Sequence, residues 1–137
     1  MAWCSRWKHL DSLMRVPVFL SRPRTARQIS GQIGEDQALA YLQMQGLTLV
    51  ERNFRCKGGE IDLIMQAKDT LIFIEVRKRA DKNHGGAAAS VTPAKQKRLI
   101  VAAHIFLQRY KMPPACRFDV IAIDGVEMSW LKNAIES

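Results

Sequence analysis

The sequence predicts one α/β domain in which a mixed β-sheet is flanked by two helices. Two segments, near residues 30–46 and 93–110, carry apolar side chains at helical spacing. Five further segments have the composition and the turn boundaries of strands. With 137 residues, 47% of them hydrophobic, the chain is long enough for one core but short for two. The predicted order of elements is α-β-β-β-α-β-β.

The first predicted helix begins near Ser30 and ends at Gly46, where a glycine can form the C-terminal cap. Five of its residues fall near one face: Ile33, Ala38, Tyr41, Leu42 and Gln45. This boundary places Glu35 and Asp36 in the first helical turn, where an acid offsets the helix dipole by about 0.3–1 kcal/mol. Taken from spacing alone, Glu35 therefore has a structural explanation.

Three strands are predicted next, at residues 47–54, 60–67 and 70–78. Turn residues at 57–59 and 68–69 separate them, so we expect an antiparallel meander. Residues 80–90, which are rich in glycine and alanine, predict a mobile loop.

The second predicted helix follows Thr92, an N-cap residue, with Pro93 at the first helical position. Its apolar positions recur at helical spacing: Leu99, Ala102, Ala103, Phe106 and Tyr110. Strands at residues 117–123 and 126–131, joined by the turn pair Asp124-Gly125, complete the fold.

The charge distribution indicates a partner with dense negative charge, such as nucleic acid or an anionic membrane face. The net charge is +8 and the isoelectric point about 9.8. Residues 1–28 hold six basic side chains against one acid and predict a flexible basic extension, leaving residues 29–137 as the folded domain. Residues 77–98 hold seven basic side chains against one acid, so the domain has its own basic patch.

Several classes of protein are disfavoured by what the sequence contains. No apolar run approaches the length of about 20 residues that a membrane span needs, so we expect a cytoplasmic protein without membrane insertion. Cys4, Cys56 and Cys116 are odd in number and widely spaced. A disulfide framework and a zinc site are therefore not expected.

Two acids lie within apolar strands and are predicted to face each other. Strand alternation places Glu60, Asp62 and Ile64 on one face, and it places Ile61, Leu63 and Met65 on the other. If Lys68-Asp69 form a two-residue hairpin loop, Asp62 lies opposite Glu75 and Glu60 lies opposite Arg77.

Opposed residues have Cβ atoms about 4.5–5.5 Å apart, and two carboxylates at that distance repel unless a proton or a cation lies between them. An acid in a strand is by itself more often solvated or paired in a salt bridge. The predicted register and the basic patch favour Mg²⁺ or Mn²⁺ bound by Asp62 and Glu75.

The motifs resemble one family. Gly34-Glu35, Gly59-Glu60-Ile61-Asp62-Leu63-Ile64 and Phe73-Ile74-Glu75-Val76-Arg77 are similar to those of the YraN family of predicted nucleases. The resemblance covers about residues 30–135 and implies the restriction-endonuclease-like fold of Holliday-junction resolvases.

In that superfamily an acid on the first helix and an aspartate precede a Glu-x-Lys strand. The resemblance therefore implies a catalytic set of four residues: Glu35, Asp62, Glu75 and Arg77. Arg77 departs from the pattern, because an arginine can stabilise charge at a phosphate but cannot act as a base, its pKa being above about 12. Lys78 is no simple substitute, since alternation sends it to the other face.

Basic residues around the predicted loop and second helix form the candidate nucleic-acid surface. They are Lys78, Arg79, Lys82, Lys95, Lys97 and Arg98. On the helix these side chains have an alternative explanation as a solvated face. His84 and His104 are expected to be a loop polar group and a packed core residue, without a role.

The function predicted is metal-dependent phosphodiester hydrolysis of DNA, with DNA favoured over RNA and branched DNA a candidate substrate. The alternatives are a non-catalytic nucleic-acid-binding module with the same fold, or a small interaction protein that uses its basic tail. The sequence leaves open whether a homodimer forms, as a branched substrate would favour.

Overall fold

The computed structural model of the chain describes residues 23–79 and 91–135. Within these ranges the helices are α2 (Ala26–Met44) and α3 (Pro93–Leu107), and the strands are β1 (Thr48–Cys56), β2 (Gly59–Ala67), β3 (Thr70–Arg79), β4 (Ala115–Asp124) and β5 (Glu127–Ile135). The predicted order of elements is confirmed. Neither helix is long and apolar enough to cross a membrane. The first 22 residues of the predicted 1–28 extension and the predicted loop at 80–90 lie outside the described residues, whereas residues 26–28 of that extension belong to α2.

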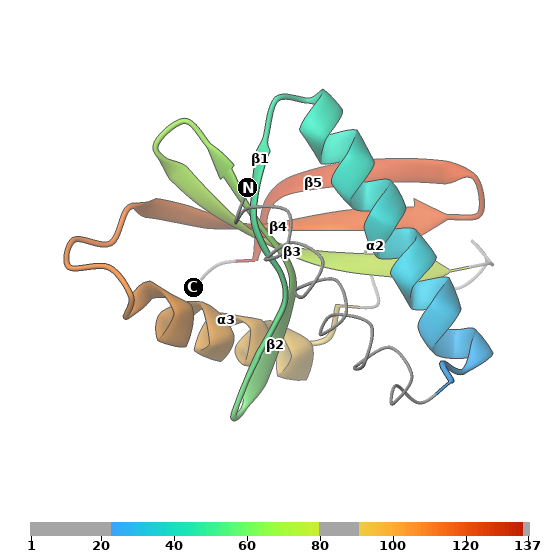
Figure 1. Cartoon of the computed structure of the whole chain (residues 1–137), viewed down its shortest axis with the longest axis horizontal. Coiled ribbons are helices and arrows are strands. Elements are labelled where there is room, and N and C mark those ends of the chain that lie inside the picture. The colour runs from blue at the N-terminus through green and yellow to red at the C-terminus, as the bar shows by residue number, and fades with distance from the viewer. Residues whose placement is uncertain (1–22, 80–90, 136–137) are drawn as a thin grey trace, which may run out of the picture.

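The five strands form one mixed sheet in the order β1-β2-β3-β4-β5 (Figure 1). The β1-β2, β2-β3 and β4-β5 pairs are antiparallel, whereas β3 and β4 are parallel and paired along their whole length, from Thr70↔Ala115 to Arg79↔Asp124. The antiparallel meander and the mixed sheet are both as predicted. Since α3 lies between β3 and β4 in the chain, it forms part of the crossover that a parallel pair needs.

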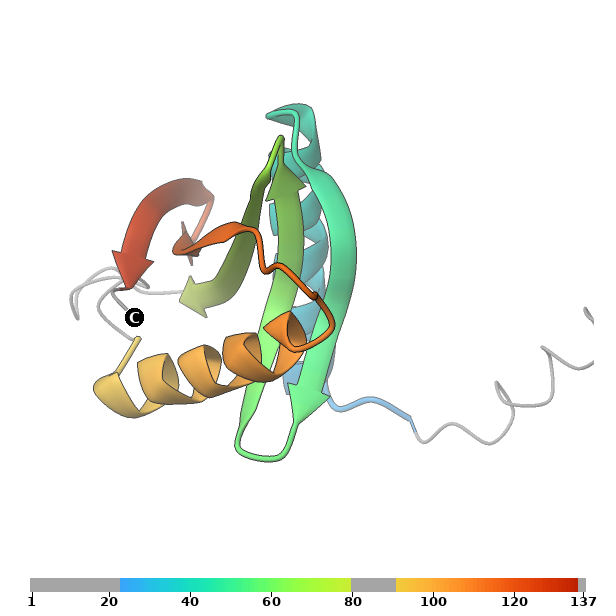
Figure 2. The same ribbon diagram turned by 90° about the vertical axis from the view of Figure 1, so that its left-hand side faces the viewer.

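The two helices cover opposite faces of the sheet, which gives three layers (Figure 2). Under α2, Ala38 and Leu42 pack on Leu63, Ile72, Ile121 and neighbouring apolar side chains. Under α3, Leu99, Ala102 and Phe106 pack on Ile64, Phe73, Phe118 and others. This arrangement is consistent with the predicted restriction-endonuclease-like class. Each face thus has its own apolar cluster.

Helix α2 begins four residues earlier than predicted, at Ala26. Thr25 caps it in a capping box: the Gln28 N–H donates to Thr25 Oγ1, and the Thr25 N–H donates to the Gln28 side chain. Glu35 and Asp36 are therefore not in the first turn, so the prediction that Glu35 offsets the helix dipole is wrong. Ile33, predicted for the buried face, is 45% exposed.

Helix α3 begins where the sequence predicted and ends at Leu107, three residues earlier than expected. Thr92 Oγ1 accepts the N–H of Lys95 at 3.2 Å, and Pro93 follows the cap. Strand β2 begins directly against the backbone of α3. A Cβ built on Gly59, its first residue, would lie 2.0 Å from the carbonyl oxygen of Arg98. Glycine is what allows this close approach.

Strand β5 continues to Ile135, beyond its predicted end at residue 131, and a buried carboxylate fixes this last part. Asp119 is fully buried and accepts hydrogen bonds from Arg117 Nε, Trp130 Nε1 and the Asn133 N–H. Asn133 has a φ of 52°, which this hydrogen bond helps to hold. These three donors, of which Arg117 Nε contacts both carboxylate oxygens, offset the cost of burying the charge.

Candidate active site

The candidate site lies where β2 and β3 separate. From the hairpin, the two strands pair in the predicted register from Ala67↔Thr70 to Leu63↔Ile74. Two residues beyond Ile74, the Val76 N–H donates to the side chain of Asp62, at 2.8 Å from Oδ2. The predicted register thus leads to adjacent acids at positions 62 and 75, at the point where the ladder ends.

The carboxylate of Glu75 is largely buried between two cations. Its side chain is 10% exposed, on the sheet face covered by α3. Glu75 Oε1 lies 3.2 Å from Lys95 Nζ and 3.7 Å from Arg77 Nη1. Glu75 therefore has one cation from its own strand and one from helix α3.

Asp62 is the most strongly perturbed acid among those described. Burial raises the pKa of its carboxyl to about 8, and the charges of Glu75 and, more weakly, Glu35 act in the same direction, against the hydrogen bond from Val76. In the metal-free protein at neutral pH this carboxyl therefore holds a proton. That proton removes the electrostatic repulsion between the carboxylates of Asp62 and Glu75.

Glu35 reaches the same region from the third turn of α2. Its carboxylate lies 3.7 Å from Arg52 Nη2 on β1, and the same guanidinium contacts Asp36 at 2.7 Å. Burial raises the pKa of Glu35, while Asn53 and Arg52 lower it. Glu35 is thus a half-buried acid held over the sheet.

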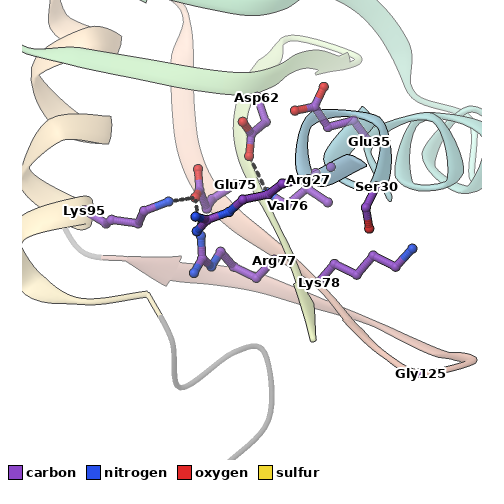
Figure 3. A pocket seen from close by; sticks show the side chains of 11 residues that line it. Arg27, Ser30, Glu35, Asp62, Glu75, Val76, Arg77, Lys78, Lys95 and Gly125 are labelled. Atoms are coloured by element: carbon purple, nitrogen blue, oxygen red, sulfur yellow. Dashed lines mark hydrogen bonds and ion pairs between the residues drawn. The ribbon is translucent and has the colours of Figure 1, made fainter. Parts of the chain in front are cut away.

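A pocket of about 610 Å³ brings all four residues of the predicted catalytic set together (Figure 3). Its acids are Glu35, Asp62 and Glu75, and its cations are Arg27, Arg77, Lys78 and Lys95. Ser30 and Gly125 complete the rim from α2 and the β4-β5 turn. Three acids and four cations thus line the same pocket, a combination that can hold a divalent cation next to a phosphate.

The predicted alternation along β2 is wrong at Ile61. Ile61 packs on the α3 side together with Ile64, whereas Leu63 packs on the α2 side. The β1-β2 pairing skips the pair at Asn53, whose φ of 50° interrupts the regular alternation next to Asp62.

The predicted pair of Glu60 with Arg77 is replaced. Glu60 lies instead beside Arg55 on β1, with 3.9 Å between Arg55 Nε and Glu60 Oε2. Arg77 is oriented toward Glu75 on its own strand. The separation of β2 from β3 beyond Leu63 explains both changes, because no ladder holds positions 60 and 77 together.

The predicted nucleic-acid residues fall into different surroundings. Lys78 lies on the α2 face, as alternation predicts, with its stem next to Gly34, yet it still lines the pocket. Lys97 and Arg98 are exposed on α3. Lys95 differs from both, because it contacts Glu75. The side chain of Arg79, and all of Lys82 and His84, lie outside what the structure describes.

Sequence reasoning missed Arg27 and Ser30, and it assigned Lys95 only to the surface. The capping box at Thr25 was the signal for Arg27, since it moves this residue from the tail into α2. His104, predicted to be packed in the core, is exposed. It lines a groove on the outer side of α3 to which Lys97 also contributes, so that prediction is wrong.

The donor set fits a hard divalent cation held by few protein ligands. Within residues 23–79 and 91–135, no three His, Cys, Asp or Glu side chains are grouped closely enough to form a metal cage by themselves. Magnesium binds instead through one or two carboxylates and several waters. Asp62 and Glu75 supply such a pair, since they lie close enough for the charge of Glu75 to raise the pKa of Asp62.

Comparison with known proteins places the chain in a family. A family model described as "Uncharacterised protein family UPF0102" matches residues 34–123. The chain belongs to this family. The resemblance to YraN inferred from the motifs is thereby confirmed, because UPF0102 and YraN denote the same group. The span matched to UPF0102 contains Glu35, Asp62, Glu75, Arg77 and Lys95.

Relatives within UPF0102 match most of the chain. A UPF0102 protein of Herminiimonas arsenicoxydans is 85% identical over 124 residues, which cover 90% of this chain and 100% of the relative. One of Janthinobacterium sp. (strain Marseille) is 71% identical with the same coverage. One of Cupriavidus metallidurans is 54% identical over 117 residues, 85% of this chain and 87% of the relative. The names of these proteins state no activity.

Proposed function

We propose that this protein hydrolyses phosphodiester bonds in DNA with a divalent cation bound by Asp62 and Glu75. The observation that carries the proposal is the pairing of these two largely buried carboxylates at the base of a pocket lined by four cationic side chains. A carboxylate pair alone would repel a phosphate. When Mg²⁺ or Mn²⁺ lies between the acids, and cationic side chains lie around them, the pocket attracts a phosphate group.

The residues of the chain have separate parts in this proposal. Asp62 is oriented by the Val76 N–H, and Glu75 is oriented by Arg77 and Lys95. A bound Mg²⁺ or Mn²⁺ would polarise the scissile phosphate and lower the pKa of a coordinated water. Arg77 and Lys78 provide positive charge for the phosphate oxygens, and Glu35 supports the site from α2.

A non-catalytic DNA- or RNA-binding module is the second candidate, and one observation favours it. Glu75 has two cations within 4 Å, so its charge is compensated by protein groups alone. Such a protein would keep the basic pocket as a phosphate site and would need no metal. As part of the first proposal, we also propose that the protein is cytoplasmic and that two copies of the chain bind a branched substrate together.

A cleavage screen separates the two candidates. Labelled single-stranded, linear duplex, nicked and four-way-branched DNA, with matched RNA, would be incubated with Mg²⁺, Mn²⁺ or a chelator. We expect cleavage of at least one DNA form that requires the metal and is lost in Asp62→Asn and Glu75→Gln. Binding without cleavage of any form, unchanged in both variants, would support the second candidate.

A further inference from the structure

Lys95 faces the sheet rather than the solvent. It precedes Leu99 by four residues and Ala102 by seven, so it continues the buried stripe of α3 toward the N-terminus of the helix. The hydrogen bond from its N–H to Thr92 Oγ1 fixes the first turn in which it lies. The direction of the side chain therefore follows from the helix position and its cap.

The ammonium group of Lys95 ends inside the candidate site. Lys95 Nζ lies 3.2 Å from Glu75 Oε1, and the side chain is 39% exposed, so one side of the ammonium group faces the pocket (Figure 3). Lys97, two residues further on, is exposed and borders a different, shallow groove with Ile100 and His104. Only the first of these two lysines can act on the acids.

Arg77 occupies the strand position where the Glu-x-Lys pattern has its lysine. Its guanidinium approaches the same oxygen, Glu75 Oε1, at 3.7 Å. A guanidinium is planar and spreads its charge, whereas an ammonium is a compact charge with three donors. The two cations on Glu75 are therefore chemically different, and the compact one comes from α3.

We propose that Lys95, supplied by helix α3, is the catalytic lysine that strand β3 lacks at Arg77. This inference rests on the proposed function. In the hydrolysis, a water oxygen forms a bond to phosphorus and the bond from phosphorus to the leaving deoxyribose oxygen breaks. One water proton ends on that oxygen through solvent. Lys95 stays protonated: it donates to the attacking water and stabilises the negative charge that develops at the phosphate.

A purely structural ion pair between Lys95 and Glu75 predicts something different. Half-exposed ion pairs contribute little to stability, and the loss of a purely structural one would leave the turnover rate unchanged. Turnover is therefore what distinguishes the two cases, because the loss of a positive charge beside Glu75 raises metal affinity in both. The catalytic role requires an ammonium within the reacting site. Removing it lowers the turnover rate, and it raises the affinity for a divalent cation, because a positive charge beside one ligand is lost.

The test compares the full-length parent with Lys95→Ala, Lys95→Arg and the control Lys111→Ala, which removes the same charge at an exposed position beyond the C-terminal end of α3. Thermal unfolding establishes that each variant folds. Three further quantities are measured: kcat and KM for the best DNA substrate, and Mn²⁺ affinity by calorimetry. For Lys95→Ala we expect kcat to fall by about 100-fold or more with KM nearly unchanged. We expect its Mn²⁺ affinity to rise by about fivefold.

The arginine variant tests the chemistry of the cation. Lys95→Arg keeps the positive charge, so its Mn²⁺ affinity should stay near the parent value while kcat falls. Lys111→Ala should match the parent in every quantity. A folded Lys95→Ala variant that keeps the kcat of an active parent, or whose Mn²⁺ affinity is unchanged, would overturn the role of Lys95 but not the proposed function. A parent that binds Mn²⁺ yet cleaves no substrate would overturn the proposed function, and the catalytic role with it.

Discussion

Asp62 and Glu75 differ in how their negative charges are compensated. Glu75 lies beside the cations of Lys95 and Arg77, whereas Asp62 accepts a single backbone hydrogen bond from Val76. Burial and the neighbouring charge of Glu75 therefore raise the pKa of Asp62 to about 8. A metal ion at the site would take the place of the proton that Asp62 then holds.

The raised pKa of Asp62 predicts a pH dependence of stability. A group whose pKa is higher in the folded than in the unfolded state stabilises the fold when protonated, and this contribution is lost as pH rises toward the folded pKa, here about 8. Asp62→Asn mimics the protonated form. In metal-free buffer we expect the variant to gain stability relative to the parent between about pH 4 and pH 8, by at least about 1 kcal/mol.

Urea unfolding of both proteins across this pH range measures the difference. Asp69→Asn, in the exposed hairpin turn, is the matched control and should show no such trend. A stability difference between Asp62→Asn and the parent that stays constant with pH would contradict the proton assigned to Asp62.

Sequence reasoning reached the acid pair but not the lysine, for a physical reason. The pair follows from a two-residue hairpin at Lys68-Asp69, where local turn geometry fixes the register. The contact between Lys95 and Glu75 joins residues 20 positions apart, through packing of α3 on the sheet. The helical stripe that contains Lys95 and Leu99 was nevertheless visible, and it indicates which lysine faces inward.

At the scale of elements, the distance between α3 and β2 decides whether Lys95 reaches Glu75. Gly59 starts β2 directly against the α3 backbone, with Ala102 on the same contact. Any side chain at this position would displace the helix backbone, because a carbonyl oxygen cannot move aside as a flexible side chain can. The position of Lys95 therefore depends on a glycine at the start of β2, where this strand lies against α3.

Gly59→Ala should accordingly destabilise the protein by roughly 2 kcal/mol or more and weaken any activity. Gly31→Ala is the contrasting variant, since a Cβ there would meet no atom within 4 Å and alanine is the better helix former. It should stabilise the fold by about 0.5–1 kcal/mol. Equal changes in unfolding free energy for the two variants, measured in urea, would contradict the close approach at Gly59.

Element ends were predicted less well than element identities. The start of α3 could be predicted because Thr92-Pro93 is a local signal. The end of β5 could not, since Asn133 is held by Asp119, a buried residue 14 positions earlier. The alternation of side chains along the strands is likewise interrupted at Asn53, and this depends on its positive φ, which composition does not reveal.

At the scale of the whole molecule, the described residues by themselves bring four cationic side chains to the pocket. Arg27 is in α2, Arg77 and Lys78 are in β3, and Lys95 is in α3. The positive charge required for a phosphate is thus built into the folded part. The segment of residues 1–22 adds further charge, through four basic side chains against one acid.

Removing residues 1–22 should therefore keep nucleic-acid binding and cleavage, with a lower affinity and a flatter salt dependence because fewer phosphates are contacted. The deletion stops before Thr25, so that the cap of α2 is preserved. Fluorescence anisotropy over a range of salt concentrations measures both quantities. Complete loss of binding would favour the alternative in which the basic tail is the only interacting part.

The central claim is that Asp62 and Glu75 together bind a divalent cation, and calorimetric titration with Mn²⁺ tests it most directly. The titration is made at a pH above the raised pKa of Asp62, so that most of this carboxyl is ionised. We expect saturable binding to the parent and to Asp69→Asn, and a loss of at least about tenfold in affinity for both Asp62→Asn and Glu75→Gln, each still folded. Affinity that is unchanged in both site variants, or a parent that binds no Mn²⁺, would contradict it.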